Sequence, residues 1–328
     1  MDQTSGATAR LRGISAVSAR VAWASGAKGT VLRTVNGGAT WERRPVPDGE
    51  QLDFRDIDAF SADVAYALSI GPGPASRIYK TTNGGSQWVL QFTNKDPDIF
   101  FDAMAFLDPR RGFAFSDSVG GQFVILTTKD GGEHWERIPG ASLPPAKPGE
   151  GAFAASGTNV AVYGGRHVWV GTSASRVLRS SDAGATWTIA PSPLRTGDSA
   201  GIFSIAFRDA LHGAIVGGDY RQERDAIENA AVTSDGGVTW TLVGGHGLSG
   251  FRSVVAWVPG TTGSLVAVGP SGSDWSTDGG LTWTPIAGAG FDTFSFAPGT
   301  RSGWAAGDGG RIARLTIVPP GVRSRLRD

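Results

Sequence analysis

The sequence predicts an all-β protein: one domain folded as a seven-bladed β-propeller whose blades are four-stranded antiparallel sheets. The first observation is an octapeptide that occurs six times and always ends in tryptophan, with the tryptophans at 41, 88, 135, 187, 240 and 283. A spacing of 43 to 53 residues is typical of a solenoid, a propeller or an array of small units. The second observation is apolar alternation, broken by glycine, between the copies.

That alternation predicts short strands in every unit. The strands expected in the first unit are residues 11–17, 20–23, 30–33 and 40–43. Those expected in the second unit are residues 54–60, 64–68, 77–80 and 87–90. A single four-stranded sheet leaves two edges and an apolar face uncovered, so the units must pack against one another. Radial packing around an axis, as in a propeller, provides those neighbours.

Each octapeptide fits the hairpin between the third and fourth strands of its unit. The third residue of each copy has a side-chain oxygen that accepts hydrogen bonds from the turn's own amides: Asn36, Asn83, Asp130, Asp182, Asp235 and Asp278. The glycine two positions later, such as Gly237, suits a positive φ. The tryptophan is expected to pack between adjacent sheets and to contribute up to about 4–6 kcal/mol.

The pattern Ser/Thr-x-Asp-x-Gly-x-Thr-Trp resembles the Asp-box (BNR) repeat of sialidase-type and related β-propellers. The resemblance extends from about Leu11 to Ile317. The spacing and the strand openings LRGI and FRDI are most similar to the photosystem II assembly/stability-factor group and its relatives in non-photosynthetic bacteria. The resemblance implies a binding or assembly role. Because nothing in the residues indicates photosynthesis, that particular client is not carried over.

Seven first strands are expected, beginning near Leu11, Phe54, Phe101, Gly151, Ile202, Phe251 and Phe291. The last unit has no octapeptide, so residues 1–8 are predicted to supply its fourth strand and close the ring. The propeller domain then spans residues 1–318, and residues 319–328 are predicted to form a flexible tail. Six blades followed by an unstructured remnant is the alternative.

Composition narrows the function classes. Lys plus Arg and Asp plus Glu number 30 each, so no net charge favours nucleic acid as a partner. The absence of cysteine excludes disulfides and thiolate chemistry, and the four histidines lack metal-binding spacing, so no metal or other cofactor is expected. No apolar stretch is long enough to span a membrane. Residues 1–8 do not resemble a signal peptide. Since similar proteins are often exported, we expect a periplasmic or extracellular monomer whose signal peptide has been removed.

The first strands of a propeller line its central channel, so the residues at their starts are the first binding candidates. Five charged residues align at one register: Arg12, Arg55, Asp102, Arg252 and Asp292. Such a ring predicts a site that binds a polar ligand through charge-assisted hydrogen bonds. The alternative is a ring of mutual ion pairs that closes the channel and binds nothing.

The loops between second and third strands are expected to open on the same face. The longest carries Asp219, Tyr220 and Arg221, and long loops on a rigid scaffold often hold binding residues. A simply solvated loop is the alternative. The best acidic cluster that the sequence offers is Asp102, Asp117, Glu150, Asp219 and Tyr220. Two of its carboxylates, about 5–10 Å apart, would serve as acid and base in glycoside cleavage.

These observations favour a non-enzymatic binding or assembly factor whose channel face holds a protein segment or an acidic ligand. The alternative is a secreted glycan-active hydrolase or lyase that uses the carboxylate cluster. A structural module cut from a larger protein is a third hypothesis. Sialidase activity is not expected, because the Arg-Ile-Pro sequence at residues 137–139 follows the third octapeptide on an outer strand. None of the four tyrosines has an obvious glutamate partner.

Overall fold

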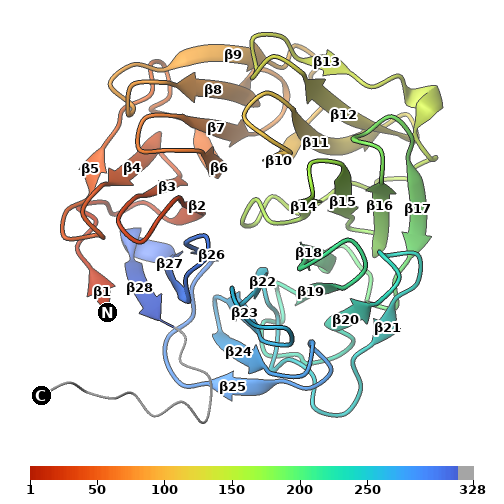
Figure 1. Ribbon diagram of the computed structural model, residues 1–328. Coiled ribbons are helices and arrows are strands. Elements are labelled where there is room, and N and C mark those ends of the chain that lie inside the picture. Colours follow the sequence, from red (N-terminus) through yellow and green to blue (C-terminus); the bar gives the residue numbers. More distant parts are fainter. Residues whose placement is uncertain (317–328) are drawn as a thin grey trace, which may run out of the picture.

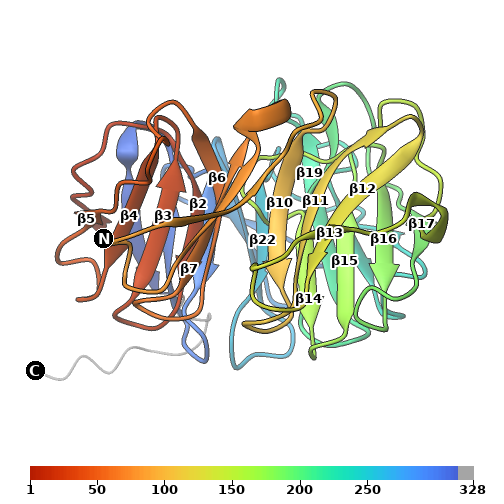
Figure 2. The same ribbon diagram turned by 90° about the horizontal axis from the view of Figure 1, so that it is seen from above.

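The computed structural model describes residues 1–316, which form seven four-stranded antiparallel sheets arranged in a closed ring (Figure 1). The predicted fold, an all-β seven-bladed propeller with four-stranded blades, is confirmed. Seen at right angles to that view, the strands run roughly along the axis of the ring (Figure 2). The tail predicted at residues 319–328 lies outside the described residues.

Within each blade the first strand lies next to the channel and the fourth lies on the outside. Blades one and two consist of β2 (Leu11–Ala16), β3 (Ala22–Gly26), β4 (Thr30–Thr34), β5 (Glu42–Arg43), β6 (Asp53–Ala59), β7 (Ala65–Ile70), β8 (Arg77–Thr81) and β9 (Val89–Thr93). Blades three and four consist of β10 (Phe101–Phe106), β11 (Gly112–Val119), β12 (Gln122–Thr128), β13 (Glu136–Arg137), β14 (Val160–Tyr163), β15 (His167–Gly171), β16 (Arg176–Ser180) and β17 (Thr188–Pro191).

Blades five and six consist of β18 (Ala200–Phe207), β19 (Gly213–Asp219), β20 (Ala230–Thr233), β21 (Thr241–Leu242), β22 (Val254–Trp257), β23 (Leu265–Gly269), β24 (Gly272–Ser276) and β25 (Thr284–Ile286). Blade seven consists of β26 (Thr293–Phe296), β27 (Ser302–Ala306), β28 (Ile312–Thr316) and β1 (Asp2–Gln3). Helical structure within residues 1–316 is limited to short 3₁₀ turns: η1 (Gly73–Ala75), η2 (Gly140–Ser142) and η3 (Asp308–Gly310).

The ring is closed by its own N-terminal strand, because β1 pairs with β28 in the register Asp2↔Ala313 and Gln3↔Ile312. The Gln3 Oε1 atom accepts hydrogen bonds from two indoles, that of Trp41 in blade one at 3.0 Å and that of Trp304 in blade seven at 3.2 Å. One side chain therefore joins the first and last blades. Closure lets the first and last blades pack against each other, as every other pair of neighbouring blades does.

The apolar core lies between neighbouring blades, and the octapeptide tryptophans contribute to it. Trp283 is 5% exposed and packs among residues of blades five and six, including Ala214, Val216 and Leu265. Trp88 meets Trp23 of the preceding blade edge to face, with ring centroids 5.9 Å apart. The octapeptide tryptophans therefore pack between sheets, although Trp135 and Trp240 are only half-buried.

The six octapeptides form hairpin turns of one design, which we call the octapeptide turns. In the fifth copy the Asp235 carboxylate accepts hydrogen bonds from the Thr239 amide at 3.0 Å and the Thr239 hydroxyl at 2.6 Å. The Thr233 hydroxyl donates to the same carboxylate at 2.8 Å and accepts from the Gly237 amide at 3.0 Å. Gly237 has a φ of +82°. As predicted, the third residue accepts hydrogen bonds from the turn and the glycine has a positive φ. The hydroxyl of the first residue also bonds to the turn, a role that was not predicted from the sequence.

The channel is blocked by a loop from blade four, residues 151–159, which we call the plug (Figure 1). The first strand of this blade begins at Val160 rather than near Gly151. The plug crosses to other blades: the Ser156 hydroxyl donates to the Ser253 carbonyl of blade six at 2.8 Å, and the Ala154 carbonyl accepts from Arg55 of blade two at 2.9 Å. These contacts explain why the segment leaves the strand path.

Candidate functional site

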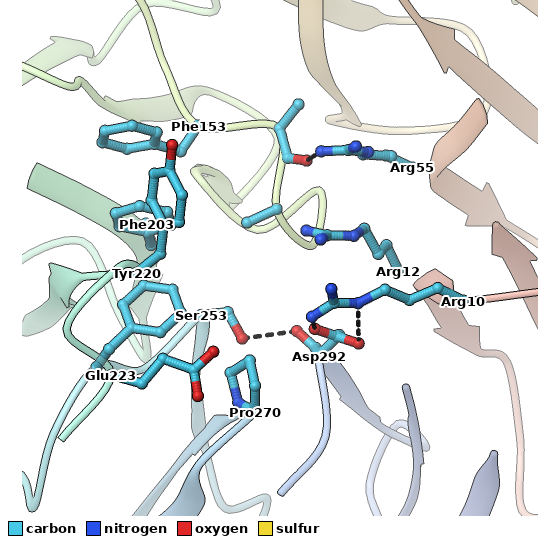
Figure 3. A pocket seen from close by; sticks show the side chains of 13 residues that line it. Arg10, Arg12, Arg55, Phe153, Phe203, Tyr220, Glu223, Ser253, Pro270 and Asp292 are labelled. Carbon is cyan, nitrogen blue, oxygen red and sulfur yellow. Dashed lines mark hydrogen bonds and ion pairs between the residues drawn. The ribbon is translucent and has the colours of Figure 1, made fainter. Parts of the chain in front are cut away.

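A cavity of about 440 Å³ lies at the channel mouth, on the face where the first strands begin and the second-to-third-strand loops turn. The plug forms part of its lining through Phe153, Ala154 and Ala155. Figure 3 shows arginines on one side of the cavity and aromatic rings on the other. We call these the arginine wall and the aromatic wall, and they are made by Arg10, Arg12 and Arg55, and by Phe153, Phe203, Tyr220 and Phe251.

Backbone bulges help to aim residues of both walls into the channel. The pairing of first and second strands shifts register across Arg12, Arg55, Asp102 and Phe203. A bulge leaves one extra residue without a partner on the neighbouring strand and redirects its side chain. Three of these four residues line a wall of the cavity.

Two of the three arginines have partners. Arg10 donates two hydrogen bonds to the Asp292 carboxylate, from Nε at 2.9 Å and from Nη2 at 2.6 Å. Arg55 donates to Asp53 at 2.8 Å as well as to the plug. Both guanidinium groups are therefore fixed in position by protein oxygens, and this geometry pre-orders the wall.

Arg12 differs from its neighbours, because within residues 1–316 its guanidinium has no hydrogen-bond or ion-pair partner. Burial first, and then the nearby charges of Arg55 and Arg10, lower the pKa of Arg12 to about 10. A half-buried cation beside two like charges is an unfavourable arrangement without an anion. The geometry thus forms a site for a carboxylate or another small anionic group.

The aromatic wall is a packed cluster with an exposed rim. Phe153 and Phe203 stack in parallel with centroids 3.9 Å apart, and Phe251 meets Phe203 edge to face at 4.6 Å. Tyr220 stands over them, with its ring centroid 6.1 Å from that of Phe203, and is 41% exposed. The Glu223 side chain completes this side of the cavity.

Two other predicted ligand-binding residues, Arg252 of the charged ring and Arg221 of the long loop, do not line the cavity. Arg252 is 1% exposed and donates to Asp274 at 2.6 Å, so it is an interior ion pair. Arg221 is exposed and lies over the Tyr220 ring, 5.7 Å from its centroid. Of the five residues predicted at one register, Arg12, Arg55 and Asp292 line the cavity.

The five residues of the predicted acidic cluster do not come together at one cavity. Asp102 is 1% exposed and its Oδ2 atom has no hydrogen-bond partner. Burial, and then the neighbouring Asp117, raise the pKa of Asp102 well above its usual value. Asp219 is also buried, and it accepts a hydrogen bond from the Arg221 amide at 2.9 Å. Tyr220 belongs to the aromatic wall.

Asp117 and Glu150 share a second cavity of about 390 Å³ on the other side of Phe153. The Glu150 carboxylate is held by the Arg176 guanidinium, by the Thr172 hydroxyl at 2.7 Å and by the Lys147 amide at 2.8 Å. Burial raises the pKa of Asp117. These two acids are therefore neighbours, but one of them is fully engaged in structural contacts.

Sequence reasoning missed Arg10, Phe153, Phe203, Glu223 and Phe251. A signal existed for Phe203, which stands at the same bulge register as Arg12 and Arg55. The prediction compared only the charged residues at the strand starts, and Phe203 is aromatic. Glu223 belongs to a loop whose path depends on tertiary contacts, such as the hydrogen bond from the Phe251 amide to the Glu223 carbonyl at 2.9 Å.

Two further features of the described residues limit what the site contains. Across residues 1–316 no three histidine or acidic side chains gather as a metal site. Nor does this part of the chain include a helix of the length and apolar character needed to cross a membrane. The cavity lining combines arginine, aromatic and carboxylate side chains with Ser253, Pro270, Ala154 and Ala155.

Solved structures similar to this one include two of YCF48 and one of a GH74 enzyme. YCF48 bound to a D1 peptide superposes with a TM-score of 0.66 and 19% identity, covering 97% of this chain and 96% of that one. YCF48 from Cyanidioschyzon merolae gives 0.65 and 19%, covering 96% and 98%. A GH74 enzyme from Niastella koreensis gives 0.52 and 13%, covering 93% of this chain and 65% of that one. At these identities the likeness establishes the fold. No protein-family model and no curated protein matches the sequence.

Proposed function

We propose that this protein is a non-enzymatic binding or assembly factor that holds an extended protein segment at the channel mouth through an acidic group. The observation that carries the proposal is the Arg12 guanidinium, which has no partner within residues 1–316 and lies between two arginines that are already fixed. A carboxylate placed there would gain charge-assisted hydrogen bonds and relieve the repulsion among the three cations. The similarity to a YCF48 structure that contains a bound peptide supports a protein segment as the ligand class.

The cavity size agrees with this ligand class. A volume of about 440 Å³ lies near the lower end of the range of about 300–1,000 Å³ that is common for small-ligand sites. It admits a few side chains from a segment and excludes a folded surface. Recognition would then depend on the chemistry of one or two partner residues, with the rest of the partner lying over the rim.

The proposal is tested by fluorescence anisotropy with short labelled Gly/Ser peptides that carry one Glu, and with matched peptides that carry Gln. We expect the Glu peptides to bind more tightly, with an affinity that falls as salt rises. The variant Arg12→Gln should weaken Glu-peptide binding about 10- to 100-fold, the effect of losing a hydrogen bond to a charged group.

The matched control is Arg20→Gln, which removes an exposed arginine at the opposite end of blade one. Because Arg20 lies far from the channel mouth, it should not contact the peptide, and this variant should retain the affinity of the unaltered protein. Equal losses in the two variants would mean that binding is non-specific. Unchanged affinity in Arg12→Gln would overturn the proposal.

A glycan-active enzyme is the second candidate, and one observation favours it. Asp117, whose pKa is raised by burial, shares the second cavity with the exposed Asp198, and two carboxyl groups at one cavity suit glycoside cleavage. Incubation with acidic and neutral oligosaccharides tests this candidate. The enzyme candidate requires that cleavage products form with the unaltered protein and are absent with Asp117→Asn. If the unaltered protein forms no products, this candidate is wrong.

We also propose that the protein is exported to the periplasm or to the outside of the cell. It rests on the resemblance of the repeats to propellers that are often exported. Fractionation of the source organism with an antibody to this protein measures it directly, and a cytosolic pool alone would contradict it.

A further inference from the structure

The aromatic wall faces the same cavity as Arg12, so an occupant that reaches the arginines also meets the aromatic rings (Figure 3). The base of this wall is closed, since Phe203 and Phe251 are almost fully buried. Its rim is open, because Phe153 is half-buried and Tyr220 is exposed. An exposed tyrosine supported by buried aromatic rings is the kind of group that provides contact area in protein interfaces.

Tyr220 is held in this position by its neighbours rather than lying free on a loop. Its ring meets Phe153 at 6.3 Å and Phe203 at 6.1 Å, in both cases edge to face. The following Arg221 covers the Tyr220 ring at 5.7 Å. Ordering the ring before binding lowers the entropy that a partner must overcome. The aromatic wall is thus a preformed apolar surface beside an anion site.

Glu223 sets a further condition on the occupant. Its side chain lies on the aromatic side of the cavity, and within residues 1–316 it has no ion-pair partner. A second acidic side chain placed against the aromatic wall would meet this carboxylate and be repelled. The two walls therefore differ in the charge that they accept. The arginine wall favours a negative group, and the aromatic wall, with Glu223 beside it, disfavours one.

We infer that the partner segment presents an acidic group and, directly beside it in the chain, a bulky aromatic or aliphatic side chain. The acidic group pairs with Arg12 and Arg55, and the apolar side chain packs against Tyr220 and Phe153. Successive side chains of an extended segment point to opposite sides of the chain, about 3.3 Å apart along it. A segment that lies between the two walls therefore directs one side chain to the arginines and the next to the aromatic rings. This inference rests on the proposed function, because it specifies the ligand of the same site.

The test uses four labelled Gly/Ser peptides of equal length, each with one central pair: Glu-Phe, Glu-Ala, Gln-Phe or Glu-Lys. We expect Glu-Phe to bind most tightly, about tenfold or more above Glu-Ala, the effect of burying one large apolar side chain. The variant Tyr220→Ala should weaken Glu-Phe binding about tenfold and leave Glu-Ala binding unchanged. Because Tyr220 is exposed, its removal leaves the buried base of the wall in place.

The matched control is Tyr163→Ala, which removes a tyrosine of nearly equal exposure, 40%, from the first-to-second-strand hairpin of blade four at the opposite end of the ring. This variant should leave all four affinities unchanged. The inference is wrong if Glu-Ala binds as tightly as Glu-Phe, or if Tyr220→Ala weakens both peptides equally. It is also wrong if Glu-Lys binds most tightly, since Glu223 would then be a site for a cation.

The peptide set separates this inference from the proposed function. If Arg12→Gln abolishes binding of every Glu peptide while Phe and Ala make no difference, the proposed function stands and the aromatic preference is wrong. If no Glu peptide binds, both are wrong. A further variant, Glu223→Gln, should raise the affinity of a Glu-Glu peptide severalfold more than that of Glu-Ala, and an equal change in both affinities would show that Glu223 does not act on the aromatic side.

Discussion

The two ends of the blades differ in how their polar side chains are paired. At the end that carries the octapeptide turns, the Asp or Asn at the third position of each of the six copies accepts a hydrogen bond from its own turn. Asp182, for example, accepts from the Thr186 amide at 2.9 Å and the Thr186 hydroxyl at 2.6 Å. At the channel mouth, Arg12 has no partner in the described chain, and the Oδ2 atom of Asp102 is buried without one. The contrast teaches that the octapeptide turns satisfy these polar groups locally, while the channel mouth leaves two charged side chains without a partner in the described residues, one of which, Arg12, faces the cavity as the proposed function requires.

The largest effect should come from removing a tryptophan of the octapeptide turns. Trp283→Ala opens a cavity between blades five and six and should lower the free energy of unfolding by about 3–5 kcal/mol. Chemical denaturation measures this loss. The matched control is Leu281→Ala, which removes a side chain that is 55% exposed in the same turn and should change stability by less than about 0.5 kcal/mol. Similar losses in both variants would show that the turn itself, rather than inter-blade packing, provides the stability.

A smaller effect of opposite sign is expected at the channel mouth for Asp102→Asn. The folded-state pKa of Asp102 is raised above its unfolded value, so this carboxyl favours the folded state at low pH and costs stability once the pH rises toward and through the folded pKa. The variant lacks that cost and should be about 1–3 kcal/mol more stable than the unaltered protein at neutral pH. Denaturation at pH 7 and pH 4 measures the difference, which should shrink at pH 4. A less stable variant at pH 7 would contradict this account.

The smallest effect is expected for Asp182→Asn in the fourth octapeptide turn. Asn36 and Asn83 already fill the equivalent position in two copies, so the variant should stay within about 0.5 kcal/mol of the unaltered protein at neutral pH. Hydrogen bonds from the Thr186 hydroxyl and amide lower the pKa of Asp182 to about 2. The charged form therefore stabilises the fold above about pH 4, and this contribution disappears as the pH falls through about 2.

Acid unfolding followed by circular dichroism checks this sign. The unaltered protein should lose stability between about pH 4 and pH 2, and Asp182→Asn should show a smaller loss over that interval. An identical acid profile in the two proteins would mean that the carboxylate charge at this turn contributes nothing to folding.

The fold could be predicted because its signals are local and repeated. The Asp235 and Gly237 positions recur in every copy, and each satisfies turn chemistry that needs no distant partner. The plug could not be predicted, because it leaves the strand path for contacts with blades two and six, which are far away in sequence. Residues 151–159 contain small side chains and little alternation, but nothing local indicates where such a loop goes.

The candidate site was predictable only where it follows strand register. Arg12, Arg55 and Asp292 were found because the starts of equivalent strands share one place in the ring. Arg252 occupies the same register but turns to Asp274, a choice made by tertiary contacts. Arg10 and Asp292 lie 282 residues apart in the chain, and their pairing depends on ring closure. Ion pairs between residues far apart in the chain therefore determine which arginine has no partner within the described residues.

The account depends most on the claim that Arg12 serves binding rather than stability. The direct test is the unfolding temperature of Arg12→Gln, with and without a Glu-Phe peptide. The folded-state pKa of Arg12 lies below its usual value, so its charge opposes folding, and the free variant should unfold at the same temperature as the unaltered protein or higher. Peptide near 100 times its Kd should stabilise the unaltered protein by about 2.7 kcal/mol and leave the variant nearly unchanged. A variant that unfolds earlier on its own, yet responds fully to the peptide, would contradict the account.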